Sequence, residues 1–283
     1  MTSLPSAKRL AALCGPAARD IALEIIAETG STNADLLARV SGANLAKHAP
    51  KDTATDAQSV GGLNGPTLLW AQSQTAGKGR AGRSWHSSIE ATLTFSLAWK
   101  FTLPPHALTG LPLAVGVSIA QTLASLGVPV QLKWPNDILK NGDKLAGILI
   151  ETATDKRARQ TIWAIIGVGI NLAQSESLRA QIGRTVADAA ELDQDRERLM
   201  ADLLSGLTES LSIFEKEGFA AFAAAWNRCD AYANAAVNIV DQGNIVQHGI
   251  ARGVDDSGCL QLDTAQGRVA IAAGDVSLRI REE

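Results

Sequence analysis

The chain is poor in the residues that form disulfides and metal centres. Its 283 residues include only three cysteines and four histidines. Cys14, Cys229 and Cys259 lie far apart and form no C-x-x-C pair, which argues for a reducing compartment and against a structural zinc site. We interpret all three as buried or incidental thiols. The histidines show no ligand spacing, so the sequence offers no candidate metal site.

Strong charge and long apolar runs are also lacking. The formal net charge is -3, so the bulk surface is not suited to polyanionic nucleic acid, and any phosphate chemistry must come from local clusters of cations. An apolar stretch near the N-terminus is broken by Gly15 and Pro16, short of the roughly 7 to 15 residues of an export signal. No other run approaches the roughly 20 apolar residues of a membrane span. We therefore expect a cytoplasmic protein.

The first half of the chain predicts one helix and two strands. Residues 31–40 form a short helix capped by Ser31 or Thr32, with Asp35 in its first turn. Residues 41–66 are polar and without periodicity, as in an exposed insertion. The apolar run 67–72 predicts a strand, and 91–101 alternates apolar with polar residues, which predicts a half-buried strand.

The middle of the chain adds a helix, a hairpin and a buried strand. Residues 111–126 place apolar side chains near a 3.6-residue period, which predicts a packing helix. Asn141-Gly142 lies between two apolar runs within 137–151, a strong hairpin signal. The apolar residues of 161–172 predict a buried strand. Successive strands with inserted helices predict an α+β fold with a mixed sheet, since regular βαβ alternation is missing.

A change of pattern near residue 233 predicts a second domain. Residues 195–226 carry apolar side chains at helical spacing. From about Tyr232 onward, short alternating segments are separated by glycines, which predicts a small all-β barrel. We therefore predict a main domain over residues 1–232 and a small β domain over 233–283.

The segment QTAGKGRAGRSW, residues 74–85, has the G-x-G-x-x-G spacing of a dinucleotide loop at Gly77, Gly79 and Gly82. That fingerprint needs a following helix and an acidic residue about 20 positions on, and neither is present. Its cations are more informative, because Lys78, Arg80 and Arg83 can donate to phosphate or carboxylate oxygens. The alternative is a solvated basic loop.

A second polar group follows one of the predicted strands. Asn136 and Asp137 come directly after Trp134-Pro135, and Lys144 lies across the hairpin turn, three residues before Gly147. Taken alone, the turn could be an Asx corner and the lysine a solvated strand end. Their occurrence beside a cationic loop on neighbouring elements favours a common site.

Six motifs, in order, resemble the biotin protein ligases from about residue 27 to 281. They are ETGSTNADLL, QTAGKGRAGRSW, KWPNDIL, KLAGILIE, IGVGINL and GDVSLR. The resemblance implies a catalytic domain related to class II aminoacyl-tRNA synthetases, followed by a small SH3-like barrel. It implies that biotin and MgATP react to biotinyl-5′-AMP and pyrophosphate. It further implies transfer of biotin to one lysine of the biotin carboxyl carrier domain of acetyl-CoA carboxylase and similar carboxylases.

The resemblance also implies which residues bind and react. Ser31, Thr32 and Asn33 match a biotin-contacting turn, and Lys144 matches a lysine near the biotin carboxylate. Position 78 is often arginine in the family; lysine keeps the charge but loses the bidentate fork. The remaining positions for substrate binding are Gln74, Gly77, Lys78, Gly79, Arg80, Arg83, Trp85, Asn136, Gly147, Asn171 and Arg279.

Lys144, Asp137 and Arg80 are the predicted catalytic residues. A carboxylate must meet the α-phosphate of ATP, and the cations with Mg²⁺ offset the repulsion between these anions. Asp137 would then orient the incoming lysine and accept its proton. We expect metal only with the nucleotide, and the glycines of 74–85 would let the loop close over the adenylate.

Other readings stay open. A lipoate ligase or octanoyltransferase would share the catalytic fold, and a non-catalytic binding module is a rival from another class. Only about 25 residues precede the first motif, too few for a helix-turn-helix domain, so we expect no operator binding. A homodimer is left open.

Overall fold

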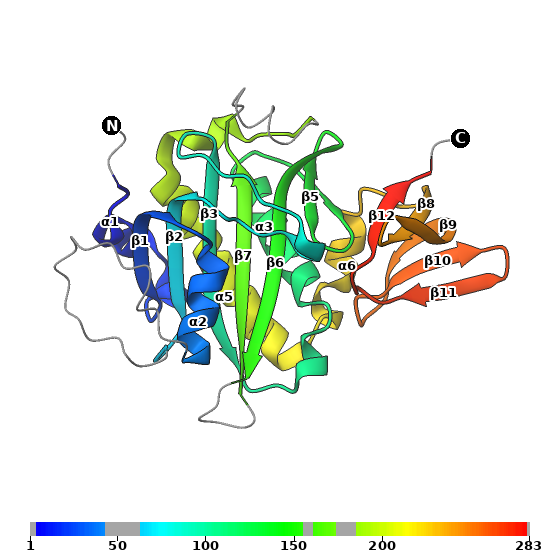
Figure 1. Cartoon of the computed structure of the whole chain (residues 1–283), viewed down its shortest axis with the longest axis horizontal. Coiled ribbons are helices and arrows are strands. Elements are labelled where there is room, and N and C mark those ends of the chain that lie inside the picture. The colour runs from blue at the N-terminus through cyan, green and yellow to red at the C-terminus, as the bar shows by residue number, and fades with distance from the viewer. Residues whose placement is uncertain (1–3, 43–62, 155–160, 174–184, 282–283) are drawn as a thin grey trace.

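The computed structural model describes residues 4–42, 63–154, 161–173 and 185–281. It contains a seven-stranded mixed sheet with helices on both faces and a five-stranded antiparallel sheet beside it (Figure 1). The predicted α+β class is confirmed. Most of the predicted insertion over 41–66 lies outside the described residues.

The large sheet has the order β1-β2-β3-β7-β6-β5-β4. Only β1 and β2 run parallel, and the other neighbours are antiparallel. The order places β7 and β6, far along the chain, in the middle of the sheet. Strand β1 was not predicted. The strands are β1 (Ala22–Thr29), β2 (Thr67–Gln74), β3 (Thr92–Phe101), β4 (Gln131–Lys133), β5 (Asp137–Lys140), β6 (Asp143–Thr154) and β7 (Ile162–Asn171).

Strand β3 is buried on both faces, so the prediction of a half-buried strand was wrong. Its polar residues Thr92, Thr94 and Ser96 are as buried as its apolar ones. Helix α2 (Thr32–Ser41) lies on the front of the sheet in Figure 1 and packs Leu36 against it. Alternation in the sequence identified the strand correctly, but it could not show that a helix covers the second face.

Helices α3 (Leu111–Ser125) and α5 (Arg196–Glu217) cover the back of the sheet and contact each other (Figure 1). Helix α6 (Ala220–Arg228) follows a break at Gly218, whose φ of 67° ends the continuous helix predicted over 195–226. The shorter helical segments are α1 (Ala7–Leu13), η1 (Pro16–Ala18), η2 (Arg80–Gly82), η3 (Pro105–Leu108) and η4 (Ala190–Asp195).

The expectation that no segment approaches a membrane span was wrong by length and composition. Residues Pro105–Ser125, which combine η3 and α3, are long and apolar enough to cross a bilayer. In this fold 72% of their most apolar window is buried. The apolar surface of α3 thus contributes to the hydrophobic core between the sheet and α5.

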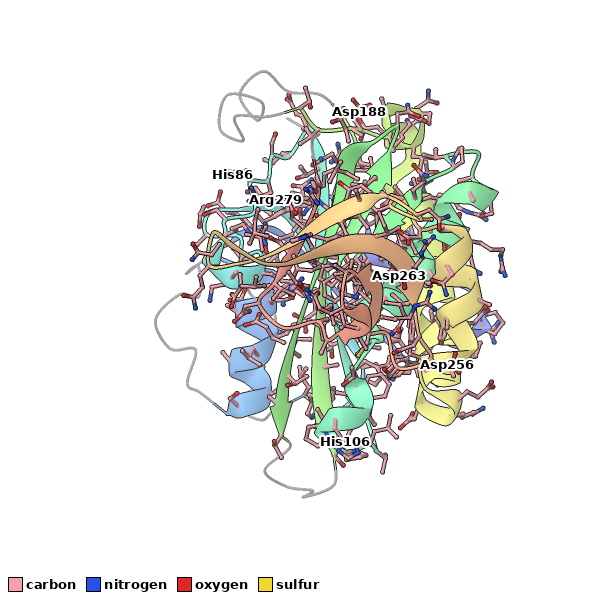
Figure 2. The ribbon with its side chains drawn as sticks, turned by 90° about the vertical axis from the view of Figure 1, so that its right-hand side faces the viewer. His86, His106, Asp188, Asp256, Asp263 and Arg279 are labelled. Atoms are coloured by element: carbon pink, nitrogen blue, oxygen red, sulfur yellow. The ribbon has the colours of Figure 1, made fainter. Side chains whose placement is uncertain are left out.

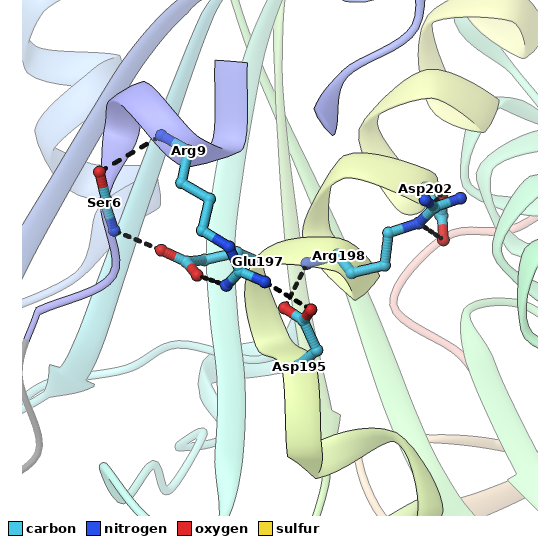
Figure 3. Close-up of polar contacts among 6 residues, drawn as sticks. All are labelled: Ser6, Arg9, Asp195, Glu197, Arg198 and Asp202. Carbon is cyan, nitrogen blue, oxygen red and sulfur yellow. Dashed lines mark hydrogen bonds and ion pairs between the residues drawn. The ribbon is translucent and has the colours of Figure 1, made fainter. Parts of the chain in front are cut away.

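Helix α1 is held to the start of α5 by charged side chains (Figure 3). Arg9 pairs with Glu197 and with Asp195 at 2.6 Å, and Ser6 caps α1 by accepting from the Arg9 amide. Half of the Arg9 side chain is exposed, so these pairs orient the helix more than they stabilise it. Leu10, fully buried, provides the apolar anchor.

The β5–β6 hairpin forms at the predicted turn. Asn141 and Gly142 have φ of 55° and 86°, the left-handed conformations that such a two-residue turn requires. Asp137 therefore lies opposite Gly147, while Lys144 lies opposite Leu139. The hairpin brings the predicted catalytic residues Asp137 and Lys144 onto adjacent strands.

The C-terminal sheet has the order β11-β10-β9-β8-β12. Trp134 is buried between the two sheets, and its Nε1 donates to the carbonyl of Gly258 at 3.2 Å. We place the proposed domain boundary near residue 233, although one hydrophobic core runs through both parts. The strands are β8 (Ala236–Asp241), β9 (Asn244–Val254), β10 (Leu260–Thr264), β11 (Gly267–Ile271) and β12 (Ser277–Ile280).

The three cysteines are free and only partly buried in the structure. Burial raises the pKa of the Cys14 thiol above its ordinary value, and the nearby Asp202 carboxylate adds to the effect. No disulfide joins these three thiols in the structure.

Replacing Trp134 with alanine should lower the free energy of unfolding by about 3–5 kcal/mol, because it leaves a large cavity between the sheets. Trp134→Phe should cost about 1 kcal/mol for the lost hydrogen bond. Trp99→Phe is the matched control, since the Trp99 Nε1 has no hydrogen-bond partner among the described residues. Urea denaturation measures all three, and equal losses for the two phenylalanine variants would contradict the role of the Trp134–Gly258 bond.

Candidate active site

A cavity of about 440 Å³ opens over β6 and β7, between the start of α2 and the loop that follows β2. Fourteen predicted positions line it, which are Ser31, Thr32, Asn33, Gln74, Lys78, Gly79, Arg80, Arg83, Trp85, Asn136, Asp137, Lys144, Gly147 and Asn171. The tertiary fold thus brings together residues that span about 140 positions in the chain.

Two predicted positions are not part of the wall. Arg279 lies on β12 of the C-terminal sheet and is exposed, and it is labelled in Figure 2. Because Arg279 is not among the lining residues, its contact with a substrate stays a prediction. Gly77 supports the loop from below: its carbonyl accepts from the Trp85 amide at 2.9 Å, and a Cβ there would lie 2.8 Å from Gln74 Nε2.

The floor of the cavity has no side chain at two paired positions. Gly147 on β6 lies directly opposite Gly169 on β7. The indole of Trp85 occupies this space, so that a Cβ at position 169 would lie 2.2 Å from its ring. The floor therefore accepts a flat group in close contact with the backbone.

The cationic loop is held by its own backbone and by Arg80. Lys78 and Ser84 form a β-bridge, and the Gly79 amide donates to the Arg83 carbonyl at 2.6 Å. The Arg80 guanidinium donates to Asn136 Oδ1 at 3.0 Å and to the carbonyl of Gly274 in the C-terminal sheet region. Arg80 thus joins the loop, the WPND turn and the C-terminal part of the chain.

Arg80 lies in a partly desolvated and strongly charged environment. Burial lowers its pKa from the ordinary value, and the neighbouring Arg83 lowers it further, while Asp137 and Asp275 act in the opposite direction. A guanidinium has so high an intrinsic pKa that it keeps its charge at neutral pH. An anionic ligand would therefore meet a fixed, poorly hydrated positive charge.

Lys144 and Asp137 form an ion pair in the cavity wall near Arg80. Their Nζ and Oδ1 atoms are 2.5 Å apart, and each side chain is about one-fifth exposed, at 22% and 21%. Asn136 Nδ2 donates to the Ile148 carbonyl at 2.7 Å and so fixes the WPND turn on β6. Asp137 is thus positioned to orient Lys144 as well as to act on a substrate.

Several wall residues were not predicted. The IGVGIN motif could have indicated Gly167 and Gly169 as wall residues, because alternate glycines in a buried strand indicate the close approach of another group. Thr94 gave no such signal, because it looked like the solvent side of β3. The missed residues are Ser84, His86, Thr94, Phe95, Ile148, Leu149, Gly167, Val168, Gly169 and Val186.

Two buried polar atoms of the cavity wall lack partners among the residues that the structure describes. They are Trp85 Nε1 and Thr94 Oγ1. Buried polar groups are almost always hydrogen-bonded. Two such atoms without partners in the wall of a cavity therefore indicate that a ligand binds there. A second cavity of about 700 Å³ shares the loop residues Lys78, Arg80 and Arg83 with the first.

A metal site built from protein ligands alone is not found within the described part of the chain, where no three His, Cys, Asp or Glu side chains cluster. The donor set around the cavity consists instead mostly of cations, amides and hydroxyls, with the Asp137 carboxylate and the His86 imidazole among them. Such a set fits a metal that arrives bound to phosphates and takes few or no protein ligands.

Comparison with known proteins identifies the family. A model of the biotin/lipoate A/B protein ligase family matches residues 48–171, and a model of the biotin protein ligase C-terminal domain matches residues 234–279. The chain is 36% identical over 229 residues to the bifunctional ligase/repressor BirA of Escherichia coli (strain K12), covering 79% of this chain and 70% of that protein. The chain therefore belongs to the biotin protein ligase family.

Two further relatives extend the match. The biotin–[acetyl-CoA-carboxylase] ligase of Mycobacterium tuberculosis is 34% identical over 259 residues, which are 90% of this chain and 88% of the relative. A solved structure titled as the biotin protein ligase from Aquifex aeolicus in complex with biotin and ATP has a TM-score of 0.70 and 28% identity. That match covers 92% of this chain and 99% of the other.

Removing the Arg80 contacts should loosen the loop. In Arg80→Ala we expect trypsin to cleave after Lys78 and Arg83 several-fold faster, because local opening costs less free energy. Arg39→Ala, which breaks an ion pair with Glu24 on another part of the sheet, is the control and should leave these two rates unchanged. Equal cleavage of Arg80→Ala and wild type would show that other contacts hold the loop.

Proposed function

We propose that the chain is an ATP-dependent biotin protein ligase. It activates biotin to biotinyl-5′-AMP with release of pyrophosphate and transfers the biotinyl group to a lysine of a biotin carboxyl carrier domain. The observation that supports this proposal most is that one cavity combines a neutral polar region with a cationic region. Neutral polar groups at the start of α2 lie beside a glycine floor, and the cations of the loop and Lys144 lie at the other end.

The first reaction joins two anions. The biotin carboxylate must attack the α-phosphate of ATP, and charge builds up on the phosphoryl oxygens and on pyrophosphate. Lys78, Arg80, Arg83 and Lys144 surround the space where these groups would meet. Their positive charge lowers the repulsion and stabilises the transition state, because fixed charges in a desolvated site need no reorganisation.

Mg²⁺ is proposed to enter with ATP and to neutralise its phosphates. The cavity wall is rich in cations, so the chain's own residues hold the phosphates and leave the metal to the nucleotide. Exclusion of water protects the adenylate, a reactive mixed anhydride, and the loop joined to the C-terminal sheet by Arg80 is suited to that task.

The second reaction needs an uncharged amine from the carrier domain. Asp137 is proposed to orient that lysine and accept its proton, while its ion pair with Lys144 keeps both groups at the reaction centre. Relatives named as acetyl-CoA-carboxylase ligases support a carrier of that enzyme as the acceptor. We propose the cytoplasm, where acceptor and ATP would meet, as the location.

A lipoate ligase is the second candidate for the same catalytic fold. The match of residues 234–279 to a biotin protein ligase domain favours biotin. Exchange of labelled pyrophosphate into ATP, measured with biotin, lipoate or no acid, tests the proposal. Exchange that requires biotin is expected, while lipoate-dependent exchange or none would overturn it.

Replacing Lys144 with alanine should reduce biotin-dependent exchange by at least about 100-fold, since it removes a charge at the developing anion. Lys140→Ala is the matched control on the same hairpin, because Lys140 pairs with Glu191 outside the cavity. Its exchange rate should equal that of wild type. Wild-type exchange in Lys144→Ala would remove this lysine from the site.

Asp137→Ala should separate the two reactions. Adenylate formation should fall modestly, because Lys144 loses its partner. Transfer to the carrier should fall by about a further 100-fold, because the incoming lysine then lacks a proton acceptor. Single-turnover assays of each reaction measure the split, with Asp143→Ala on the exposed end of β6 as control. Equal losses in both reactions would assign Asp137 only to the positioning of Lys144.

A further inference from the structure

A continuous row of hydrogen bonds leads from the cavity wall into the sheet. Thr32 Oγ1 lies 2.6 Å from Ser96 Oγ, and Ser96 Oγ lies 2.6 Å from Asn33 Oδ1. Asn33 Nδ2 in turn donates to Glu151 Oε2 at 2.9 Å. Ser96 is fully buried, and Thr32 and Asn33 are 2% and 4% exposed, so water does not compete for these bonds.

The orientation of the Asn33 amide is determined by its surroundings. Its Nδ2 faces two acceptors, the Glu151 carboxylate and the Leu149 carbonyl at 3.3 Å. A flipped amide would place its oxygen against both, leaving two buried repulsive contacts. Gly167 makes room for this arrangement, because a Cβ there would lie 2.4 Å from Asn33 Oδ1. Asn33 Oδ1 must therefore accept a hydrogen bond from Ser96.

This orientation determines the direction of the remaining protons. The single hydroxyl proton of Ser96 goes to Asn33, so Ser96 Oγ can only accept from Thr32. Thr32 Oγ1 also lies 3.0 Å from Gln74 Oε1. Without a proton between them, two oxygens repel more strongly at 2.6 Å than at 3.0 Å, so the Thr32 proton points to Ser96.

The Gln74 amide is oriented by the backbone. The Thr32 amide donates to Gln74 Oε1 at 2.8 Å, and a nitrogen in that place would leave this donor unpaired. The Nε2 hydrogens are then the donors that Gln74 offers to a ligand. Thr32 and Gln74 both line the cavity, so its wall contains both a hydroxyl oxygen that can accept and an amide that can donate.

We infer that Asn33 and Ser96, anchored by Glu151, are positioning residues that make Thr32 Oγ1 a hydrogen-bond acceptor for the substrate. None of these three needs to touch the substrate to do so. The pair of Thr32 acceptor and Gln74 donor matches the adjacent N–H and C=O of a cyclic urea. The inference rests on the proposed function for the identity of the substrate, since biotin carries such a ring. An acceptor at Thr32 disfavours rings that have an oxygen in place of the N–H.

The test compares biotin with two cyclic carbamate analogues, in each of which a ring oxygen replaces one ureido N–H. Dissociation constants are measured by calorimetry. In wild type, one of the two analogues should bind at least about tenfold more weakly than biotin, because two acceptors then face each other. In Ser96→Ala the Thr32 hydroxyl can turn and donate to the ring oxygen, so this preference should fall at least about fivefold.

Ser118→Ala is the matched control. It removes another buried serine hydroxyl, on α3, whose oxygen has no partner among the described residues. It should keep the wild-type preference. A Ser96→Ala variant that binds biotin and retains the full preference would overturn the inference.

Neutron diffraction of the deuterated wild type tests the same point if Ser96→Ala does not fold. Deuterons are expected on Ser96 Oγ toward Asn33 and on Thr32 Oγ1 toward Ser96. A Ser96 deuteron directed at Thr32 would overturn the inference whatever the ligand is. If the wild type does not bind biotin, the proposed function is refuted instead. Neutron diffraction then still tests the proton positions.

Discussion

The pairing of β6 with β7 is the constraint on which the rest of the site depends. Its register places Gly147 opposite Gly169, so two adjacent strands offer bare backbone in the middle of the sheet. Several other functional groups approach this floor from different parts of the chain. The Trp85 ring lies on it, Lys144 stands at its edge and Asn33 packs against the next glycine, Gly167. A side chain at either paired position would push these groups away.

Charge and polarity are divided across this floor. At one end the sheet and the start of α2 bury neutral groups whose proton directions are determined by their neighbours, as for Ser96 and Asn33. At the other end Arg80 and Lys144 are paired with oxygens but keep some exposure. A ligand with a neutral polar ring and a remote carboxylate fits this division. Arg80 also links the loop to the C-terminal sheet, so the small domain takes part in holding the site.

Much of the site could be predicted because family motifs and local chemistry coincide. The Asn141-Gly142 turn indicated the hairpin that aligns Asp137 with Lys144, and the cations of 74–85 indicated an anion site. Arg279, which is exposed on β12 and outside the cavity lining, stays a prediction, because a motif match does not show which way a strand faces. Thr94 was missed for the same reason. Its polar side chain looked solvent-facing in the alternating pattern, and only the covered second face of β3 makes it part of the cavity wall.

The sequence by itself determined the elements and the chemical groups. Periodicity, turn residues and helix caps act over a few residues, and they sufficed for α2, β3 and the hairpin, while the family motifs implied most binding positions. Only the tertiary structure decided which of these groups meet and in what state. Strand order brought β7 between β3 and β6, and burial removed the water that would otherwise satisfy Ser96 and Asn33. The direction of a hydrogen bond depends on neighbours distant in the chain, so no local pattern encodes it.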